Sequence, residues 1–280
     1  MNMTKKGKWI AWVAAGICVP VLAWAAIWNP FARPDLEQSA IVLLPPANVA
    51  SPADDGDVLT VLYSGDGGWA DLDKQLGTVF AARGIPVLGI NSFKYFWRAR
   101  SREVAAEQLD ALITKYLTEW HKHRVWLVGF SFGADALPSI IDRLSPDVRA
   151  RIAQLVLLSP SHNITFEIQF QGYMIGQGRI KAFLTRVTGL FNKVPEYPAL
   201  PPVVALDNRF PVACYYGLDD RDDTLCTEAG LPAWVTVYGM PGGHHFDEGY
   251  QRLATQLIDR LPAAGGPAPA ASVAAQPAAG

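Results

Sequence analysis

The stretch that decides the fold is Val125-Trp126-Leu127-Val128-Gly129-Phe130-Ser131-Phe132-Gly133-Ala134-Asp135. Four apolar residues lead into a serine flanked by glycines two positions before and two positions after it, and a helical pattern follows. This order of strand, tight turn and helix fits the G-x-S-x-G nucleophile elbow. Glycine is needed because a side chain beside so sharp a turn would clash with the strand and the helix. We therefore expect the Ser131 hydroxyl to stand over the positive end of a helix, as a catalytic nucleophile.

Further apolar runs flank this stretch along the chain. They lie at 58–63, 86–90, 125–128 and 152–158, about thirty residues apart as βαβ units require, and again at 212–216 and 235–238. They read as continuous rather than alternating, which is typical of strands buried on both faces. The sequence therefore predicts an α/β domain at 58–262, built on a doubly wound, mostly parallel sheet, with 40–44 as a possible first edge strand.

Helical patterns fill the gaps between these runs. Leu72, Leu76 and Phe80 share one face of a predicted helix, with Asp71 as its N-cap and Gly84 as its stop. A second apolar stripe runs through 105–116, and a final helix is predicted at about 247–261.

Composition bounds the function. The chain has 280 residues, of which 50% are hydrophobic and 18% charged, which suits one sizeable globular domain with a full core. The formal net charge is −2, so the sequence has no basic footprint and predicts no nucleic-acid partner.

The N-terminus predicts a membrane-associated protein. Lys5, Lys6 and Lys8 precede the uncharged run 9–28, whose twenty residues would span about 30 Å as a helix. We favour residues 1–28 as an uncleaved anchor in the inner membrane over a signal peptide cleaved near Ala23-Trp24-Ala25, because the run exceeds a normal signal core. Both readings place the domain outside the cytoplasm, which in a bacterium is the periplasm.

Three other segments differ from the domain. Residues 29–57 are rich in proline, alanine and acidic residues and are predicted to be a linker. Residues 263–280 are rich in proline, alanine and glycine, so we expect a disordered tail. Between 160 and 204 the regular alternation breaks down, with a possible strand at 166–170 and a short helical pattern at 181–191. This insertion is either a lid over the active-site edge or an irregular extension of the sheet.

A glycine-rich turn follows the first predicted strand of the parallel sheet. Ser64-Gly65-Asp66-Gly67-Gly68-Trp69 would let backbone N–H groups approach a developing oxyanion. In a fold with a nucleophile elbow, the oxyanion hole combines an N–H of this loop with the N–H after the nucleophile, so we assign the amides of Asp66 and Phe132. A phosphate-binding loop is the rival reading, but its Gly-Lys-Ser/Thr ending is missing.

Two histidines follow the last predicted strand, where the catalytic base is expected. We prefer His245 over His244, because His245 stands four residues beyond Pro241 and directly before Phe246. Neutral imidazole can take the serine proton and pass it to the leaving group. A zinc pair is the alternative, but no third ligand is evident, so we predict no metal.

The catalytic acid is expected after the preceding strand, between Cys214 and Cys226. This loop holds four aspartates, of which Asp220 is our first choice and Asp223 the second. The others, Asp219 among them, form either a solvated turn or a negative field that attracts a cationic substrate.

The chain has 3 cysteines, and Cys18 lies in the predicted membrane run. In an exported domain, Cys214 and Cys226 are expected to form a disulfide bond. Closing a loop of this size would contribute on the order of 3 kcal/mol and fix the position of the acid.

Taken together, these segments resemble the bacterial virulence protein family VirJ/AcvB over about 58–261. The resemblance is carried by Ser64–Trp69, Tyr95-Phe96-Trp97, Gly129–Asp135, the Cys214–Cys226 loop and Gly242–Phe246. It implies a periplasmic α/β-hydrolase that removes the amino acid from lysyl- or alanyl-phosphatidylglycerol. It also places Ser131, an aspartate of the cysteine loop and His245 or His244 on the family's serine, acid and histidine.

The predicted function is hydrolysis of an aminoacylated phospholipid by a Ser-His-Asp triad, without a metal or an organic cofactor. Trp69, Asp219, Tyr95 and Trp97 are expected to contact the substrate, although core packing would also explain the aromatic side chains. Two alternatives stay open. One is an esterase or thioesterase with another substrate, and the other is a VirJ-like virulence factor that binds secretion-system proteins.

Overall fold

The computed structural model describes residues 33–47, 49, 57–166, 168 and 195–263. The predicted anchor at 1–28 and most of the predicted tail, 264–280, lie outside the described residues. Within the described residues, no helix is both long enough and apolar enough to cross a membrane.

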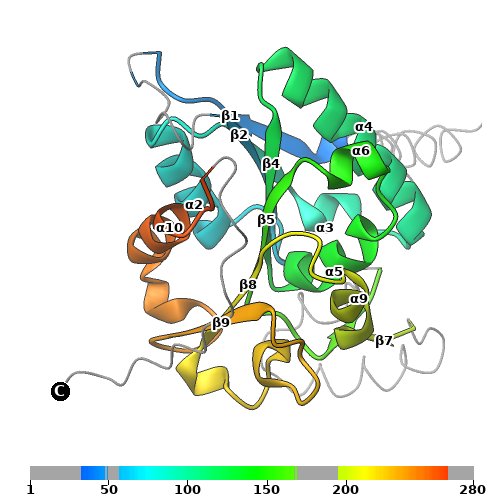
Figure 1. The fold of residues 1–280 in the computed structure, drawn as a ribbon, viewed down its shortest axis with the longest axis vertical. Helices are drawn as coiled ribbons and strands as arrows, with labels where there is room; N and C mark the ends of the chain where they lie inside the picture. The colour runs from blue at the N-terminus through cyan, green and yellow to red at the C-terminus, as the bar shows by residue number, and fades with distance from the viewer. Residues whose placement is uncertain (1–32, 48, 50–56, 167, 169–194, 264–280) are drawn as a thin grey trace, which may run out of the picture. The chain divides into compact units, whose positions relative to one another are not determined.

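The core of the domain is a seven-stranded sheet with the order β1-β3-β2-β4-β5-β8-β9 (Figure 1). Its strands are β1 (Ala40–Leu43), β2 (Val58–Tyr63), β3 (Val87–Ile90), β4 (Arg124–Phe130), β5 (Ile152–Leu158), β8 (Val212–Gly217) and β9 (Val235–Met240). β1 runs antiparallel to β3, and every other neighbouring pair is parallel. The predicted mostly parallel sheet, including its edge strand, is confirmed.

The continuous apolar runs form strands because both faces of the sheet are covered. Every residue of β2, β5 and β8 is buried. Each face carries its own cluster of buried side chains, one under α2 and α10 and the other under α4 and α5. Burial on both faces explains why these segments lack the alternation of a half-exposed strand.

The helices are α2 (Asp71–Ala82), α3 (Ser92–Tyr95), α4 (Arg102–Glu119), α5 (Phe132–Ile141), α6 (Pro146–Arg149), α9 (Leu200–Ala205) and α10 (Tyr250–Asp259). Figure 1 shows α2 and α10 side by side on one face of the sheet, with α4 and α5 on the other. The chain thus crosses from face to face, as a doubly wound sheet requires.

Helix α2 begins one residue earlier than a cap at Asp71 would imply. Ala70 is the N-cap, and its N–H donates to Oδ2 of Asp73 at 3.2 Å. The prediction that Asp71 caps the helix is therefore wrong. The capping carboxylate lies in the first turn instead, where an acidic side chain can reach back to the N-cap. Gly84, with a φ of 85°, follows the end of the helix as predicted.

The last helix is shorter than the pattern at 247–261 predicts. A 3-10 turn, η4 (Phe246–Glu248), precedes α10, and its three residues all have positive φ. Left-handed backbone cannot continue into an α-helix. The region before Tyr250 is therefore a loop, and this loop follows the two histidines.

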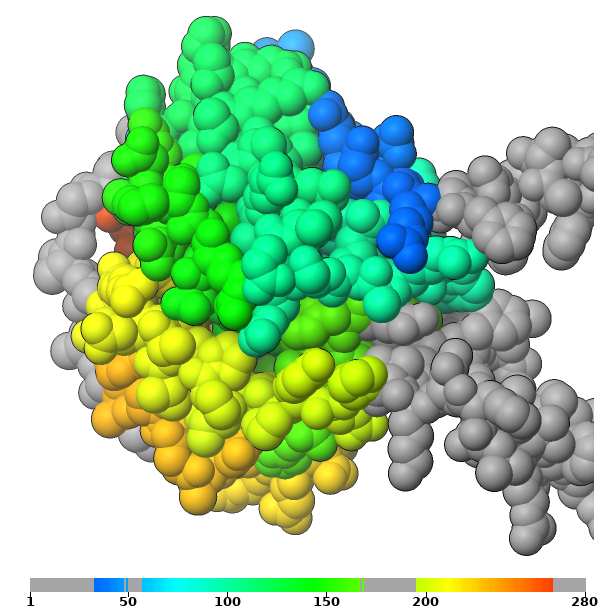
Figure 2. Space-filling model, turned by 90° about the vertical axis from the view of Figure 1, so that its right-hand side faces the viewer, coloured from blue at the N-terminus to red at the C-terminus, as the bar shows by residue number. Residues whose placement is uncertain are grey.

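The domain begins earlier than the predicted boundary at Val58. One compact unit extends from Pro34 onward, and Leu36 is 1% exposed. Figure 2 shows this segment, in blue, lying against the residues of α3 and α4. The Leu36 N–H donates to Gln108 of α4 at 3.1 Å, and Lys115 of α4 pairs with Glu37. Part of the predicted linker is therefore built into the domain.

The ends of the predicted insertion at 160–204 meet in a short ribbon. β6 (Asn163–Ile164) pairs antiparallel with β7 (Tyr197–Pro198), and α9 follows directly. The helix predicted at 181–191 and most of the strand predicted at 166–170 lie outside the described residues. The reading of this insertion as a lid stays a prediction.

Candidate active site

Ser131 occupies the sharp turn between β4 and α5. It has a φ of 51° and a ψ of −118°, a conformation that a residue with a side chain rarely adopts. A Cβ on Gly129 would lie 2.5 Å from the Gly133 carbonyl oxygen, and a Cβ on Gly133 would lie 2.5 Å from the Tyr63 carbonyl oxygen. Both contacts are with backbone, which cannot move aside. The two glycines are thus required by sterics, as the G-x-S-x-G pattern predicts.

His244 contacts this serine. Its Nε2 lies 2.9 Å from Ser131 Oγ. The Ser159 hydroxyl donates to the His244 carbonyl oxygen at 3.0 Å, which holds the backbone of the histidine against the end of β5. Burial lowers the pKa of His244, and the neighbouring His245 lowers it further, while Asp220 and Asp66 oppose the shift. A neutral imidazole within hydrogen-bond distance of a serine can act as a general base.

His245 contacts Tyr250 instead. Its Nδ1 lies 3.4 Å from the Tyr250 hydroxyl, and its ring stands edge-on to that of His244. The preference for His245 as the residue beside Ser131 is therefore corrected in favour of the alternative. The physical reason is the backbone of the loop. Gly242 has a φ of 86°, and its turn directs the first histidine, not the second, toward the serine.

The acid loop lies against the histidine loop. The Asp220 carboxylate in η2 (Leu218–Asp220) approaches Gly243, whose Cβ would be 3.4 Å from its Oδ1. The Asp219 N–H donates to the Gly242 carbonyl oxygen at 3.1 Å. Gly217 is needed at this contact, because a Cβ there would lie 2.1 Å from the Gly243 carbonyl oxygen.

Among the aspartates, Asp220 has the strongest claim to the acid position. Its charge raises the pKa of His244. The hydrogen bond with Glu228 raises the pKa of His162, and the charge of Asp223 adds to that rise. The Asp219 side chain is exposed, and neither Asp219 nor Asp220 is among the residues that line the cavity beside Ser131. The first choice, Asp220, is therefore the one beside the histidine loop.

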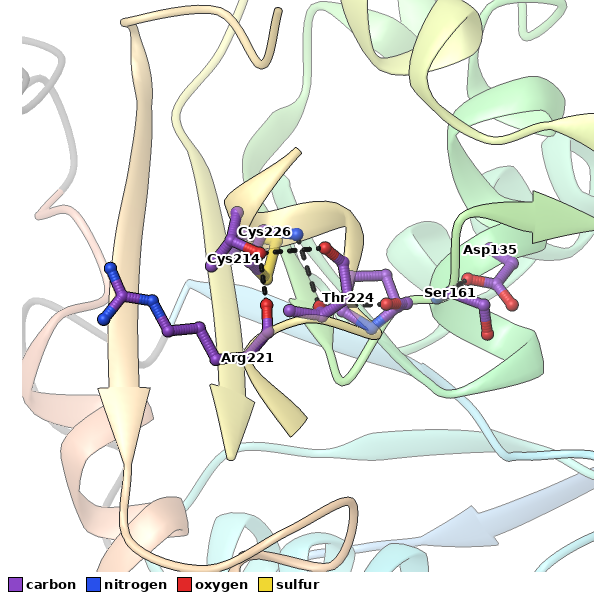
Figure 3. The surroundings of a disulfide bond; sticks show 8 residues. Asp135, Ser161, Cys214, Arg221, Thr224 and Cys226 are labelled. Atoms are coloured by element: carbon purple, nitrogen blue, oxygen red, sulfur yellow. Dashed lines mark hydrogen bonds between the residues drawn. A yellow bond between two sulfur atoms is a disulfide. The ribbon is translucent and has the colours of Figure 1, made fainter. Parts of the chain in front are cut away.

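The predicted disulfide is present between Cys214 of β8 and Cys226 of η3 (Leu225–Thr227), with a Cα–Cα distance of 5.6 Å. Figure 3 shows Thr224 between this bond and Ser161. The Thr224 hydroxyl donates to the Pro160 carbonyl oxygen at 3.0 Å, and the Ser161 N–H donates to Oδ1 of Asp135 at 2.6 Å. The bond thus ties the acid loop to β8 and, through Thr224, to the chain after β5.

The glycine-rich turn borders the serine on its other side. A Cβ on Gly65 would lie 3.5 Å from the Ser131 Cβ, and Gly68 has a φ of 77°. Phe132 is the first residue of α5, so its N–H is at the N-terminus of that helix. Asp66 and Ser131 line the same cavity, and the role of the Asp66 and Phe132 amides as an oxyanion hole stays a prediction.

A cavity of about 400 Å³ opens beside Ser131 and His244. It is lined by the glycine-rich turn, the start of α2 and the segment around the histidines: Gly65, Asp66, Gly67, Gly68, Ala70, Asp71, Leu72, Asp73, Phe130, Ser131, His244, His245, Glu248 and Tyr250. Four of these residues are acidic and none is a lysine or an arginine. Sequence analysis missed Asp73, Glu248 and Tyr250, because only the packing of α2 against α10 brings them to the serine.

The aromatic residues predicted to bind substrate lie elsewhere. The Trp69 ring packs over Gly89 and Gly77, whose Cβ atoms would meet it at 2.3 Å and 3.3 Å. Tyr95 is 1% exposed, and its hydroxyl donates to Gln108 at 2.9 Å. Trp97 packs on Phe93 with ring centroids 4.9 Å apart. Within the described residues none of the three lines the cavity, so packing explains them better than substrate contact.

The fold and the elbow together define an α/β-hydrolase fold. Similar solved structures share it. One is a proline iminopeptidase from Mycobacterium smegmatis, with a TM-score of 0.54 and 10% sequence identity over 79% of this chain and 93% of that chain. Another is Est1E from Butyrivibrio proteoclasticus, with a TM-score of 0.50 and 12% sequence identity over 79% of this chain and 93% of that chain. The esterase Pf2001 from Pyrococcus furiosus is also similar, with a TM-score of 0.50 and 13% sequence identity over 79% of this chain and 87% of that chain.

The particular family follows from the sequence. The family model described as bacterial virulence protein (VirJ) matches residues 57–264. This match covers most of the chain, so the protein belongs to the VirJ family, and the predicted resemblance is confirmed. No curated protein matches the chain.

Proposed function

We propose that this protein is a serine hydrolase that cleaves the aminoacyl ester of lysyl- or alanyl-phosphatidylglycerol. The observation that carries the proposal is the contact of 2.9 Å between His244 Nε2 and Ser131 Oγ at the elbow. A serine hydroxyl becomes a nucleophile when a base beside it can accept its proton.

The reaction is acyl transfer to water. His244 accepts the Ser131 proton while Oγ attacks the ester carbonyl carbon. The amides of Asp66 and Phe132 donate to the oxyanion that forms. The tetrahedral intermediate collapses, His244 returns the proton to the glycerol oxygen, and phosphatidylglycerol leaves. Water activated by His244 then attacks the acyl-enzyme, and the free amino acid is released. The negative charge of Asp220 stabilises the imidazolium that forms in both steps.

The choice of substrate rests on family and on charge. The resemblance to VirJ/AcvB proteins implies an aminoacylated phosphatidylglycerol, which carries an ammonium group next to the ester. The acidic lining of the cavity supports such a substrate, because a cleft of one charge concentrates ligands of the opposite charge. The ester differs from other acyl donors in that ammonium group, so the group is the feature to test.

Release of amino acid tests the proposal. The full chain in detergent is incubated with vesicles that contain lysyl- or alanyl-phosphatidylglycerol, and free lysine or alanine is measured. We expect release by the wild type and a loss of at least about 10³-fold in Ser131→Ala. Ser139→Ala is the matched control, because Ser139 lies on the same helix and its hydroxyl has no partner in the described part of the chain. Equal release by wild type and Ser131→Ala contradicts the proposal.

We also propose that residues 1–28 tether the domain to the periplasmic face of the inner membrane, where this lipid is accessible. The support is the sequence pattern of three lysines followed by an uncharged run. A fusion of alkaline phosphatase after residue 263 tests the topology. Phosphatase activity is expected, because alkaline phosphatase becomes active only outside the cytoplasm. A fusion protein that is stable but has no phosphatase activity contradicts this placement.

A further inference from the structure

Asp73 is a buried carboxylate at the edge of the cavity beside Ser131. It is 2% exposed, lies in the first turn of α2 and is among the residues that line this cavity. Its Oδ2 accepts the Ala70 N–H at 3.2 Å. Its Oδ1 is fully enclosed and has no hydrogen-bond partner in the described part of the chain. Capping of α2 therefore uses one carboxylate oxygen and leaves the other unexplained.

An unpartnered oxygen of this kind is costly. Leaving a buried polar atom without a hydrogen bond destabilises a protein, and more so when the group is charged. Such atoms are rare in folded proteins, and each calls for an explanation. Here the oxygen belongs to a residue that borders a cavity. A donor that enters this cavity and displaces the atoms covering Oδ1 would satisfy it.

The surroundings specify the charge of that donor. Asp71 on the same helix turn and Glu248 before α10 line the same cavity, and Asp66 lies across it. Burial raises the pKa of Tyr250, and the charges of Glu248, Asp71 and Asp73 raise it further. Among the residues that the structure describes, Lys74 is the one cation whose charge acts on the Asp73 carboxyl. It is exposed and does not line the cavity. An anion or a neutral donor would leave this negative field uncompensated.

We propose that Asp73 is a specificity-determining residue that binds an ammonium group of the acyl part of the substrate through its free Oδ1. The inference rests on the proposed function, since it assigns the cationic acyl group to the cavity next to Ser131. The ammonium donates to Oδ1 while Oδ2 keeps the Ala70 N–H, so substrate binding does not disturb the helix start.

The state of Asp73 agrees with this role. Burial raises its pKa to about 7, while the N–H groups of Ala70 and of Asp73 itself and the charge of Lys74 act against the rise. A bound ammonium would favour the ionised form, because an opposite charge at close range lowers the pKa of a carboxyl. Ionisation of the Asp73 carboxyl is therefore unfavourable without a nearby cation and becomes favourable when one binds. This gives the site a preference for charged over neutral acyl groups.

The experiment compares esters that differ only in ammonium groups. The acyl group of hexanoyl-phosphatidylglycerol is nearly as long as the lysyl group but has no ammonium group. We expect Asp73→Asn to lower the ratio of kcat/KM for the lysyl ester to that for the hexanoyl ester by about 10- to 100-fold. Asparagine keeps an oxygen acceptor for the Ala70 N–H. Glu107→Gln removes an exposed charge from α4, and Glu107 does not line this cavity, so its effect on this ratio should be smaller than about 3-fold.

Two further esters identify the ammonium group. The alanyl ester has only the α-ammonium, and the Nα-acetyl-lysyl ester has only the side-chain ammonium. A selective loss on either one supports the proposal and names the group that Asp73 binds. An unchanged ratio in Asp73→Asn, or an equal fall in Glu107→Gln, overturns it.

Inhibition of the wild type covers the case in which Asp73→Asn does not fold. Hexylammonium should inhibit hexanoyl ester hydrolysis at least about 10-fold more strongly than hexanol, and equal inhibition overturns the proposal. Failure of the proposed function looks different. The wild type would then leave every aminoacyl lipid intact, or Ser131→Ala would cleave them equally well.

Discussion

Ser131 has a backbone conformation that costs an L-residue about 1–3 kcal/mol, and its neighbours keep it there. The Gly133 position touches the backbone of β2, and the Ser131 N–H donates to the Leu158 carbonyl oxygen of β5 at 2.8 Å. The elbow could be predicted from sequence because its sterics are local to five residues. The choice between the two histidines could not, because it depends on the positive φ of Gly242 and on the fold of the following 3-10 turn.

The two histidines are expected to differ in function. His244→Ala should lower kcat/KM by at least about 10³-fold, since it removes the base beside Ser131. His245→Ala should retain most activity and move the acid limb of the pH–rate profile to higher pH. The reason is that His245 helps to lower the pKa of His244, and the base must be neutral to act. Profiles of kcat/KM between pH 4.5 and 8 measure both effects. A loss in His245→Ala as large as that in His244→Ala would refute the assignment.

Asp135 is expected to make stability depend on pH. Burial raises its pKa to about 7 from an ordinary 3.8, although the Ser161 N–H opposes the rise. The native protein therefore keeps a proton that the unfolded chain releases. The resulting stability is complete below pH 3.8 and is lost as the pH rises through about 7.

Asp135→Asn keeps an acceptor for the Ser161 N–H and cannot ionise. We expect its free energy of unfolding to equal that of the wild type at pH 4 and to exceed it at pH 8. Urea denaturation at the two pH values gives the comparison. Asp142→Asn, a more exposed residue on the same chain segment, serves as the control. If Asp135→Asn lowered the free energy of unfolding by the same amount at both pH values, ionisation of the buried Asp135 would not be the cause of the pH dependence.

At the scale of elements, the acid loop and the histidine loop act as one unit. The Asp219 N–H bonds to Gly242, Gly217 touches Gly243, and the bond between Cys214 and Cys226 closes the acid loop. Local pattern predicted the acid loop and its disulfide, because both follow from order along the chain. Contacts between loops, which depend on distances across the sheet edge, were not predictable.

Removal of the disulfide should affect stability and catalysis together. Cys214→Ala/Cys226→Ala is expected to lower the free energy of unfolding by about 3 kcal/mol, because the unfolded chain gains freedom in a loop of this size. It should also lower kcat, since Asp220 would be held less firmly beside His244. Urea denaturation and initial rates measure the two effects. Reduced wild-type protein should behave like the variant. Unchanged kcat in both would mean that the bond does not position the acid.

The elements also show where pattern reading fails. The strands were predicted within two residues at their ends because both faces of the sheet bury apolar side chains, and such runs are visible in sequence. The N-cap at Ala70 and the late start of α10 were missed, since each depends on backbone geometry outside the helix. The same holds for Trp69, whose place over Gly89 and Gly77 requires the packing of α2 on β3.

On the scale of the whole molecule, the family match and the folded unit have different beginnings. The match starts at residue 57, whereas the compact unit starts at Pro34. The residues between contribute β1 to the sheet and bury Leu36 against α4. The stable domain is therefore larger than the sequence signature of the family.

A comparison of two soluble proteins tests this difference. A chain that begins at residue 57 should unfold with a free energy lower by on the order of 3 kcal/mol than one that begins at residue 34, because burial of Leu36 and pairing of β1 are lost. Urea denaturation of the pair provides the measurement. A substitution of Leu36 by alanine in the longer chain should reproduce part of the loss. Equal stability of the two chains would mean that this segment only lies on the surface.

The two-residue ribbon of β6 and β7 has a consequence for how the family can diversify. It holds Ile164 and Tyr197 in register, so the two ends of the intervening segment stay adjacent whatever its length. Closing a longer segment between fixed ends costs little, about 0.6 kcal/mol for each doubling of its length. The ribbon therefore allows segments of different length and composition to replace one another between β6 and β7 during evolution. The sheet and the serine–histidine pair would keep their positions.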